Sequence, residues 1–316
     1  MEEQCKKTPK ERIEEKYGSA DYEDLIRNQG ISDPDIARAA FDAGVCYPFV
    51  VYQDAPADVR DKLIGLLDNG EPEKPKVNNY LVALAMIGDD IVADYFQKWE
   101  DAPRPWRDSL YVGPCRYAEE GGWCIENGQK RQLFFNECYA LEKSATASPE
   151  ENVYGGTAEE KCPFCESSYV NVLVLDGRDE RLSFLGLNGK IKIKYCEGCL
   201  PWSGTVFCKF TEDGESSVIQ HEDGEEYFCE DEDLNDRTPF VLSKKMVPKS
   251  YCDAFERCAV GGRPAFLDDA TFAVCPECGK KMMHLAQLGE EWTTCGTHYI
   301  QICPDCHIAA IQYQQT

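Results

Sequence analysis

The feature that most constrains this chain is a set of four Cys-x-x-Cys pairs, which occur two by two. A Cys-x-x-Cys turn can aim two thiolates at one point, and two such turns joined by a hairpin complete a tetrahedral shell of four sulfurs. That closed geometry is typical of structural zinc, so the spacing predicts two zinc-ribbon-like units holding two structural Zn²⁺ ions. The predicted ligands are Cys162, Cys165, Cys196 and Cys199 for the first ion, and Cys275, Cys278, Cys303 and Cys306 for the second.

Other uses of paired cysteines fit this pattern less well. Redox Cys-x-x-Cys motifs occur singly at a helix N-terminus, whereas each of these pairs stands beside a predicted strand. Catalytic zinc keeps an open position beside His, carboxylate or water ligands, and four cysteines close the shell. Iron–sulfur binding by the same sulfurs stays open as a minor alternative. His307 directly follows Cys306 and is an alternative ligand in its place, although we expect it to lie outside the ring of ligands.

The two cysteine quartets look like copies of one unit. Both cysteines of the first Cys-x-x-Cys turn, or knuckle, recur at one constant offset, which takes Cys162 to Cys275. The second knuckle recurs at a slightly smaller offset, which takes Cys196 to Cys303, so the second copy has the shorter hairpin. In each copy a strand follows the first knuckle, another enters the second, and a third follows it. The sequence therefore predicts a mostly-β domain over residues 157–316, built from two duplicated units. The strands are expected near residues 170–175, 191–195 and 205–210, and again near 282–288, 299–302 and 309–313.

The N-terminal part of the chain is predicted to be helical. Helix-start signals occur at Ser32–Asp35, Asp54–Pro56 and Asp89–Asp90, and apolar residues at helical spacing follow each of them. The stretch Val77–Trp99 resembles a HEAT-type repeat, with a generic helical bundle as the alternative. We therefore predict an α+β, multidomain protein whose first domain, residues 1–142, is α-helical.

Residues 102–141 interrupt this helical pattern with three prolines and a Gly-Gly pair. Trp106 and Trp123 lie in this irregular segment. We expect each to fill the edge of the core, with a recognition surface as the alternative. Residues 143–156, which are rich in Ser, Ala, Glu and Gly, form the predicted interdomain linker.

An acidic segment, residues 211–236, contains twelve acidic residues and no Lys or Arg. It lacks the ligand spacing of an EF-hand, so a solvated loop is the expected structure. Calcium binding and contact with a basic partner are the alternatives.

The charge of the chain restricts its partners. With 33 Lys and Arg against 57 Asp and Glu, the net charge is −24. Such a field repels phosphate backbones, which argues against nucleic-acid binding and favours a basic protein partner. The longest apolar run, Tyr80–Ile87, is too short to span a bilayer, and the N-terminal residues show no signal peptide. We therefore expect a cytoplasmic protein without membrane contact, in which the ten remaining cysteines are buried thiols.

A resemblance to a known family rests on Val260–Phe266, followed by the knuckle Cys275–Cys278 and the strand Met282–Leu288. These residues look like the C-terminal region of programmed cell death protein 2. They also resemble related bacterial duplicated β-domains of unknown function, some of which are immunity proteins found beside toxins. The resemblance covers about residues 155–316, and Phe266 stands where that family commonly has Trp. It implies an internally duplicated β-domain with a non-enzymatic binding role, either chaperone-like or toxin-neutralising.

Two functional hypotheses follow. No nucleophile–base pattern or phosphate-binding loop is visible, and the four histidines are scattered along the chain. The first hypothesis is a non-enzymatic, zinc-containing protein-binding module, such as an immunity protein or a chaperone for a basic partner. The alternative is an enzyme of unrecognised type, hydrolase-like, with its pocket between the two domains. The sequence predicts no oligomeric state.

Overall fold

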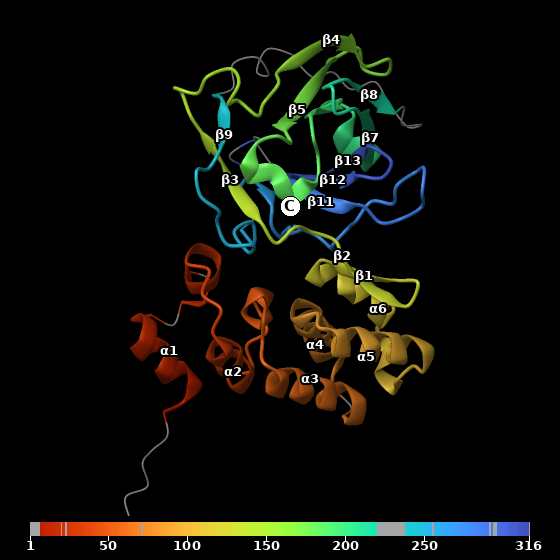
Figure 1. The fold of residues 1–316 in the computed structure, drawn as a ribbon. Helices are drawn as coiled ribbons and strands as arrows, with labels where there is room; N and C mark the ends of the chain where they lie inside the picture. The colour runs from red at the N-terminus through yellow and green to blue at the C-terminus, as the bar shows by residue number, and fades with distance from the viewer. Residues whose placement is uncertain are drawn as a thin grey trace, which may run out of the picture. The chain divides into compact units, whose positions relative to one another are not determined.

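The computed structural model describes residues 7–19, 21–22, 24–70, 72–219, 238–254, 256–290, 292 and 296–315. The chain divides into two compact units, Met1–Leu133 and Phe134–Thr316. The first is mainly helical and the second is mostly β (Figure 1), so the predicted α+β class is confirmed. Within the described residues, no helix combines the length and apolar character needed to cross a membrane.

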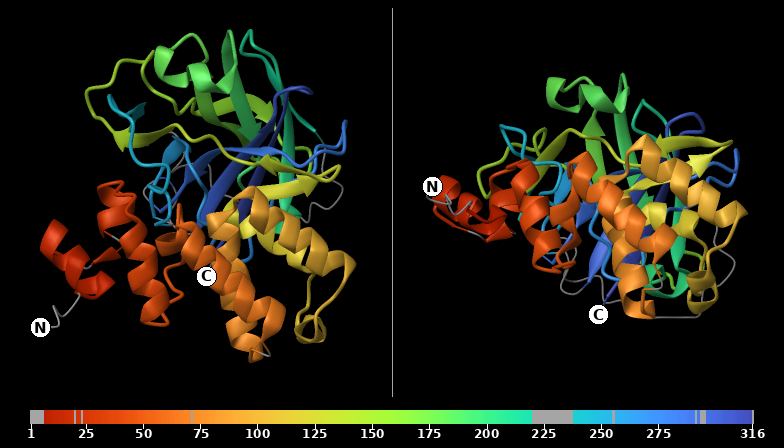
Figure 2. Two further views of the ribbon diagram at one scale, coloured as in Figure 1. Left: turned by 60° about the horizontal axis from the view of Figure 1, so that its bottom comes forward. Right: turned by 90° about the horizontal axis from the view of Figure 1, so that it is seen from below.

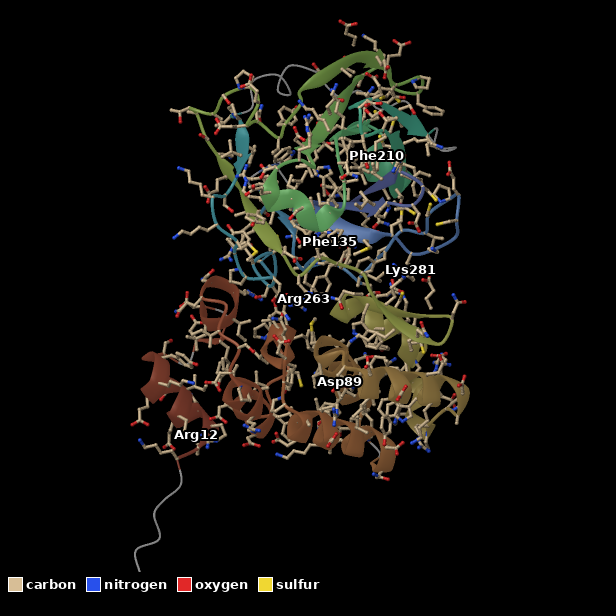
Figure 3. The ribbon with its side chains drawn as sticks, viewed as in Figure 1. Arg12, Asp89, Phe135, Phe210, Arg263 and Lys281 are labelled. Carbon is tan, nitrogen blue, oxygen red and sulfur yellow. The ribbon has the colours of Figure 1, made fainter. Side chains whose placement is uncertain are left out.

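Short helices make up most of the first unit (Figure 2, red to orange). Two predicted helix starts are confirmed, because Asp33 accepts the Asp35 N–H before α2 and Asp89 accepts the Val92 N–H before α5 (Asp89 is labelled in Figure 3). A further helix, α1, begins with a Thr8–Glu11 capping box that the sequence analysis missed. The HEAT-type repeat stays a prediction. The helices are α1 (Pro9–Tyr17), α2 (Pro34–Asp42), α3 (Ala57–Asn69), α4 (Lys74–Ile87), α5 (Asp90–Asp101) and α6 (Pro114–Tyr117).

Both tryptophans of the irregular segment belong to the core of the first unit. Trp106 and Trp123 are buried, and their indole N–H groups donate to the carbonyls of Leu67 and Ala85, each at 2.8 Å. These carbonyls lie in the last turns of α3 and α4, where helical partners are missing. The expectation that these rings fill the core is therefore confirmed. Trp123 begins a small hairpin made of β1 (Trp123–Glu126) and β2 (Gln129–Gln132).

Two antiparallel sheets are formed by the described residues of the second unit. The larger has eight strands in the order β8-β7-β13-β12-β11-β10-β3-β9, and the smaller has the order β4-β5-β6. The strands predicted around the cysteines are all present. The bounds are β3 (Cys138–Lys143), β4 (Thr157–Lys161), β5 (Ser168–Asp176), β6 (Lys190–Tyr195), β7 (Thr205–Phe210), β8 (Ser216–Ile219), β9 (Phe240–Leu242), β10 (Ala259–Gly261), β11 (Met283–Leu288), β12 (Thr297–Cys303) and β13 (Ile308–Gln314), with a short helix α7 (Leu200–Ser203) before β7.

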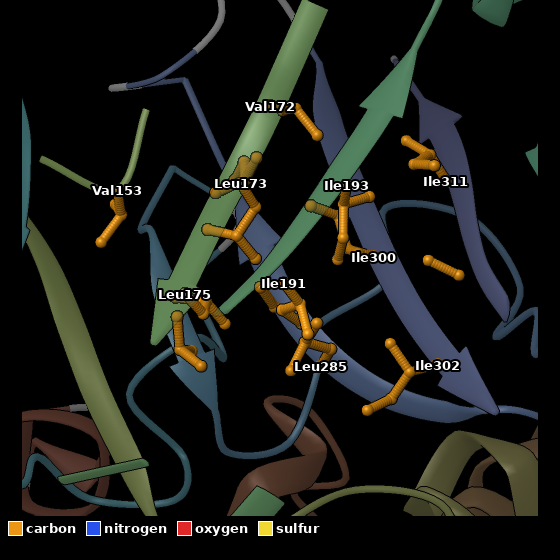
Figure 4. Close-up of a cluster of buried hydrophobic side chains, with 14 of the residues drawn as sticks. Val153, Val172, Leu173, Leu175, Ile191, Ile193, Leu285, Ile300, Ile302 and Ile311 are labelled. Carbon is orange, nitrogen blue, oxygen red and sulfur yellow. The ribbon is translucent and has the colours of Figure 1, made fainter. Parts of the chain in front are cut away.

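The main core of the second unit lies between these sheets (Figure 4). Alternation in Lys190–Tyr195 turns Ile191 and Ile193 of β6 inward, where they join buried side chains of β5 and of β11–β13. Full burial of one such aliphatic side chain contributes about 1.5–3 kcal/mol. The labelled residues of Figure 4 are Val153, Val172, Leu173, Leu175, Ile191, Ile193, Leu285, Ile300, Ile302 and Ile311.

The hairpins β5–β6 and β11–β12 share one register. Val170 pairs with Tyr195, and Met283 pairs with Ile302. The step from Val170 to Met283 equals the offset between the first knuckles, and the step from Tyr195 to Ile302 equals the offset between the second knuckles. The other pairs of β11 and β12 keep the same two offsets from β5 and β6. A β-bulge interrupts each hairpin at the same place. It leaves Val172 of β5 and Leu285 of β11 without a partner in the strand pairing.

The backbone on either side of the first knuckle in each quartet also corresponds. Lys161 pairs with Ser168, and Val274 pairs with Lys281, which is the same pairing moved by the first-knuckle offset. The third strands differ, however. In the second half β13 pairs with β12, whereas in the first half α7 follows the knuckle and β7 pairs with β13 and β8.

The predicted linker and part of the predicted acidic loop belong to the second unit. The division of the chain falls at Leu133, ahead of the predicted linker, because β3 pairs with β10 and β9. Residues 144–156 pack in the same unit: Val153 is buried and donates its N–H to the carbonyl of Phe240 at 2.9 Å. Within the predicted acidic loop, residues 216–219 form the strand β8, and residues 220–237 lie outside the described residues.

Candidate metal centres

The first quartet forms where β4, β5 and β6 bring two knuckles together. In the first knuckle the Cys162 N–H donates to Ser167 O, and the Glu166 N–H donates to Cys162 O, each at 2.9 Å. The second knuckle follows β6 and leads into α7. Its sulfurs meet those of the first knuckle, with Sγ–Sγ distances of 3.6 Å for Cys162–Cys199 and 3.3 Å for Cys165–Cys196.

The second quartet repeats this backbone arrangement in its first knuckle. The Cys275 N–H donates to Lys280 O at 2.8 Å, and the Gly279 N–H donates to Cys275 O at 2.9 Å. The residue after the knuckle has positive φ in both copies, 59° at Glu166 and 72° at Gly279. The second knuckle is the turn of the β12–β13 hairpin, and Cys278 and Cys303 lie with their sulfurs 3.7 Å apart.

Both donor sets suit a tetrahedral metal ion. The four sulfurs of each quartet all lie within 4.8 Å of one another. A zinc–sulfur bond of about 2.3 Å places the sulfurs of a tetrahedral shell about 3.8 Å apart, close to the distances found in both quartets. Each quartet can therefore hold a metal ion, as predicted for all eight cysteines, and four thiolates suit soft ions such as Zn²⁺.

Backbone N–H groups favour the thiolate form at one cysteine of each site. At Cys165, burial raises the pKa, but hydrogen bonds from the Ser167 backbone and hydroxyl outweigh it and lower the pKa overall. At Cys278, the backbone N–H of Lys280 is the main cause of a lowered pKa. The N–H of the neighbouring Gly279 donates to Cys275 O and not to a sulfur.

The two thiols of the second knuckle in each quartet resist ionisation without a cation between them. Burial raises the pKa of Cys199 to about 12 and that of Cys303 to about 11. Burial also raises the pKa of Cys196 and Cys306. A divalent ion bound at the centre would reverse this balance, because it stabilises every thiolate that coordinates it.

The three histidines that the structure describes lie outside both candidate metal sites. Within the part of the chain that the structure describes, the groups of His, Cys, Asp or Glu placed to share a metal ion are the two cysteine quartets. Cys306 belongs to its quartet, while the ring of His307 lies against Phe210, with centroids 5.6 Å apart (Phe210 is labelled in Figure 3). His284 and His298 are buried in β11 and β12, and His221 lies outside the described residues.

Of the seven remaining cysteines that the structure describes, five are buried, as expected for structural thiols. The structure leaves all described cysteines as free thiols. Five of the ten outside the quartets are buried, two are half-buried, and three lie outside the described residues. The buried ones are Cys124, Cys138, Cys208, Cys252 and Cys258, and the half-buried ones are Cys46 and Cys115. Cys5, Cys229 and Cys295 lie outside the described residues.

One bacterial relative is similar along most of the chain. Over 285 residues the chain is 32% identical to the uncharacterized protein YpfL of Salmonella typhimurium (strain LT2). The chain resembles YpfL. The match covers 84% of this chain, so the likeness to YpfL extends into both units. It covers 64% of YpfL, so the chain spans less than two thirds of that protein's length. No family model matches the chain, and no solved structure matches it.

Proposed function

We propose that this chain is a non-enzymatic protein-binding module in which two structural zinc ions stabilise the β-rich unit and an acidic surface binds a basic protein partner. The donor sets support the structural role of the metal. Four thiolates close the coordination shell and leave no position for a substrate or an activated water.

The shared register of β5–β6 and β11–β12 supports an internal duplication of a zinc-ribbon-like unit. The knuckle hydrogen bonds, the bulge position and the two sequence offsets agree between the two halves. A duplicated β-domain is what the resemblance to the programmed cell death protein 2 C-terminal family implies. In that family context, an immunity protein or a chaperone is the proposed role.

The observation that carries the binding proposal is a row of carboxylates along α5. Asp90, Asp94 and Asp101 lie at positions i, i+4 and i+11, so they share one face of the helix. They line a groove of about 630 Å³ between α5 and the β1–β2 hairpin. Asp90 and Asp94 are exposed and make no ion pair with another described residue.

The lysines at the edge of this groove have other partners. Lys98 Nζ lies 3.3 Å from the Asp68 carboxylate, and Lys130 Nζ donates to Gly88 O and lies over the Trp123 ring. These lysines therefore leave the Asp90 and Asp94 carboxylates exposed to solvent, where a cation from another protein can bind them. Together with a net charge of −24, this supports a partner that presents Lys or Arg side chains.

A pull-down from native extract of the source cells, with two matched variants, tests the proposal. Asp90→Asn with Asp94→Asn removes two charges from the groove, and Glu14→Gln with Glu15→Gln removes two charges from α1 of the same unit. We expect the groove variant to bind the recovered partner about tenfold more weakly, since each surface ion pair contributes up to about 1 kcal/mol. The α1 variant should bind like the wild type.

Raised salt should also weaken the complex, because exposed charge pairs are screened. Recovery of no protein partner would contradict the proposal. Equal retention of the partner by both variants would contradict the role of the α5 carboxylates.

A further inference from the structure

The two cysteine quartets differ in how far solvent reaches them. The first cysteine of every knuckle is buried in both quartets. The second cysteine differs: Cys165 is half-buried where its counterpart Cys278 is exposed, and Cys199 is buried where its counterpart Cys306 is half-buried. The second site is therefore more open at two of its four sulfurs.

A surface cavity adjoins the second site at the more open knuckle. It has a volume of about 540 Å³ and is lined by Cys306 and His307 together with residues of β7 and β8. A volume of that size admits a small chelating molecule next to the Cys306 sulfur. Because β7 and β8 are distant in sequence from this knuckle, no pattern in the sequence predicted the cavity.

Two exposed ion pairs lie at the second site, beside an apolar cluster in which Met282 and Ile308 pack with Cys275 and Cys303. Lys280 Nζ lies 3.2 Å from Asp305, a pair that joins the two knuckles, and Lys209 Nζ lies 2.8 Å from Glu277. The four side chains are between 49% and 74% exposed, so these pairs hold the knuckles weakly and are screened by salt.

The first site also has an apolar cover, and three of its four cysteines are buried, compared with two of the second site's. Phe164 and Tyr169 pack against its cluster of buried cysteines. Apolar packing of this kind excludes water and does not weaken with salt. A competing ligand therefore meets one half-buried sulfur, Cys165, at the first site, and the other three sulfurs lie behind packed side chains.

We infer that the second quartet is an exchangeable metal site, which small chelators and soft divalent cations reach past Cys278 and Cys306, while the first quartet keeps its ion until the unit unfolds. This inference rests on the proposed presence of two zinc ions. Exchange involves no redox step: donor atoms of the chelator replace thiolate sulfurs on the ion, and the freed thiolates take up protons from water.

Zinc transfer to the chromogenic chelator 4-(2-pyridylazo)resorcinol tests the inference on the reduced, zinc-loaded full chain. We expect two phases of equal amplitude, one zinc ion each, with rate constants that differ at least about tenfold, because local opening needs less free energy than unfolding of a packed core. Thiols labelled by N-ethylmaleimide at the end of the fast phase, identified by peptide mass spectrometry, should include Cys278 and Cys306 and exclude Cys165 and Cys199.

Two matched variants assign the phases independently. Cys278→Ser should lose the fast phase and keep the slow one, and Cys165→Ser, at the corresponding position of the first quartet, should keep the fast phase. If either variant fails to fold, the labelling of the wild-type chain still assigns the sites.

Release of both ions in one phase, or labelling of Cys165 before Cys278, would overturn the inference while leaving the two-zinc proposal in place. Elemental analysis that finds fewer than two zinc ions per chain would overturn the two-zinc proposal, and this inference with it.

Discussion

Replacing His284 with leucine should remove a pH-dependent loss of stability from the second unit. His284 lies on β11 with no exposed surface. Neither of its ring nitrogens has a hydrogen-bond partner among the described residues. Burial in this apolar setting lowers the pKa of His284 from 6.5 to about 3.

The direction of the effect follows from proton binding. Below pH 6.5 the unfolded chain takes up a proton at this histidine, and the folded chain does not until the pH approaches 3. The free energy of unfolding therefore falls as the solution becomes more acidic, by about 1.4 kcal/mol per pH unit. Between pH 6.5 and pH 5 this amounts to about 2 kcal/mol.

Urea unfolding of the wild type and of His284→Leu at pH 8 and pH 5 measures the effect. At pH 8 the variant should be more stable than the wild type by about 1–3 kcal/mol, because leucine has no polar atoms and the two unpaired ring nitrogens of His284 are gone. At pH 5 the difference should grow by about 2 kcal/mol. Both proteins carry the same cysteines, so acid effects on the quartets cancel in this comparison. A difference that is the same at both pH values would refute the reasoning.

Three further predictions concern the core of the first unit and the metal. Gly121→Ala should destabilise the first unit by about 3 kcal/mol, because a Cβ would lie 1.9 Å from Ala85 O; the control Gly65→Ala, in α3 with open space around it, should be neutral or stabilising in the same thermal unfolding assay. Trp123→Phe removes the hydrogen bond to Ala85 O and should cost about 1–3 kcal/mol in urea unfolding; an unchanged midpoint would contradict it. Cys275→Ser should reduce the zinc content from two ions per chain to one by elemental analysis and destabilise the second unit strongly, since zinc binding contributes of order 10 kcal/mol in isolated fingers; full zinc content would exclude Cys275 as a ligand.

Local sequence signals predicted much of the secondary structure. The cap residues Asp33 and Asp89 mark the starts of α2 and α5, because a short acidic side chain satisfies backbone N–H groups that the helix leaves free. The strand expected near residues 191–195 is β6, which begins one residue earlier, at Lys190. The capping box of α1 was equally readable from Thr8 and Glu11, and it was missed.

The cysteine spacing determined more than the metal ligands. A tetrahedral four-sulfur site needs two knuckles in contact, and this requirement brings together segments that are separated in the sequence. The constant offset between the two first knuckles also anticipated the common register of the two hairpins. No sequence pattern predicted the bulges at Val172 and Leu285, because a bulge depends on how each strand fits its partner.

The sequence by itself determined which residues can bind metal and where α2, α5 and the strands beside the cysteines lie, because caps, alternation and ligand spacing act over a few residues. Only the tertiary structure decided that β7 pairs with β13, that residues 144–156 pack in the second unit, and that the second quartet is the more open one. The burial of His284 without a partner was decided in the same way. Each of these features depends on contacts between segments that are far apart in the chain. A pattern of neighbouring residues cannot predict which of these segments meet, or which side chains they bury.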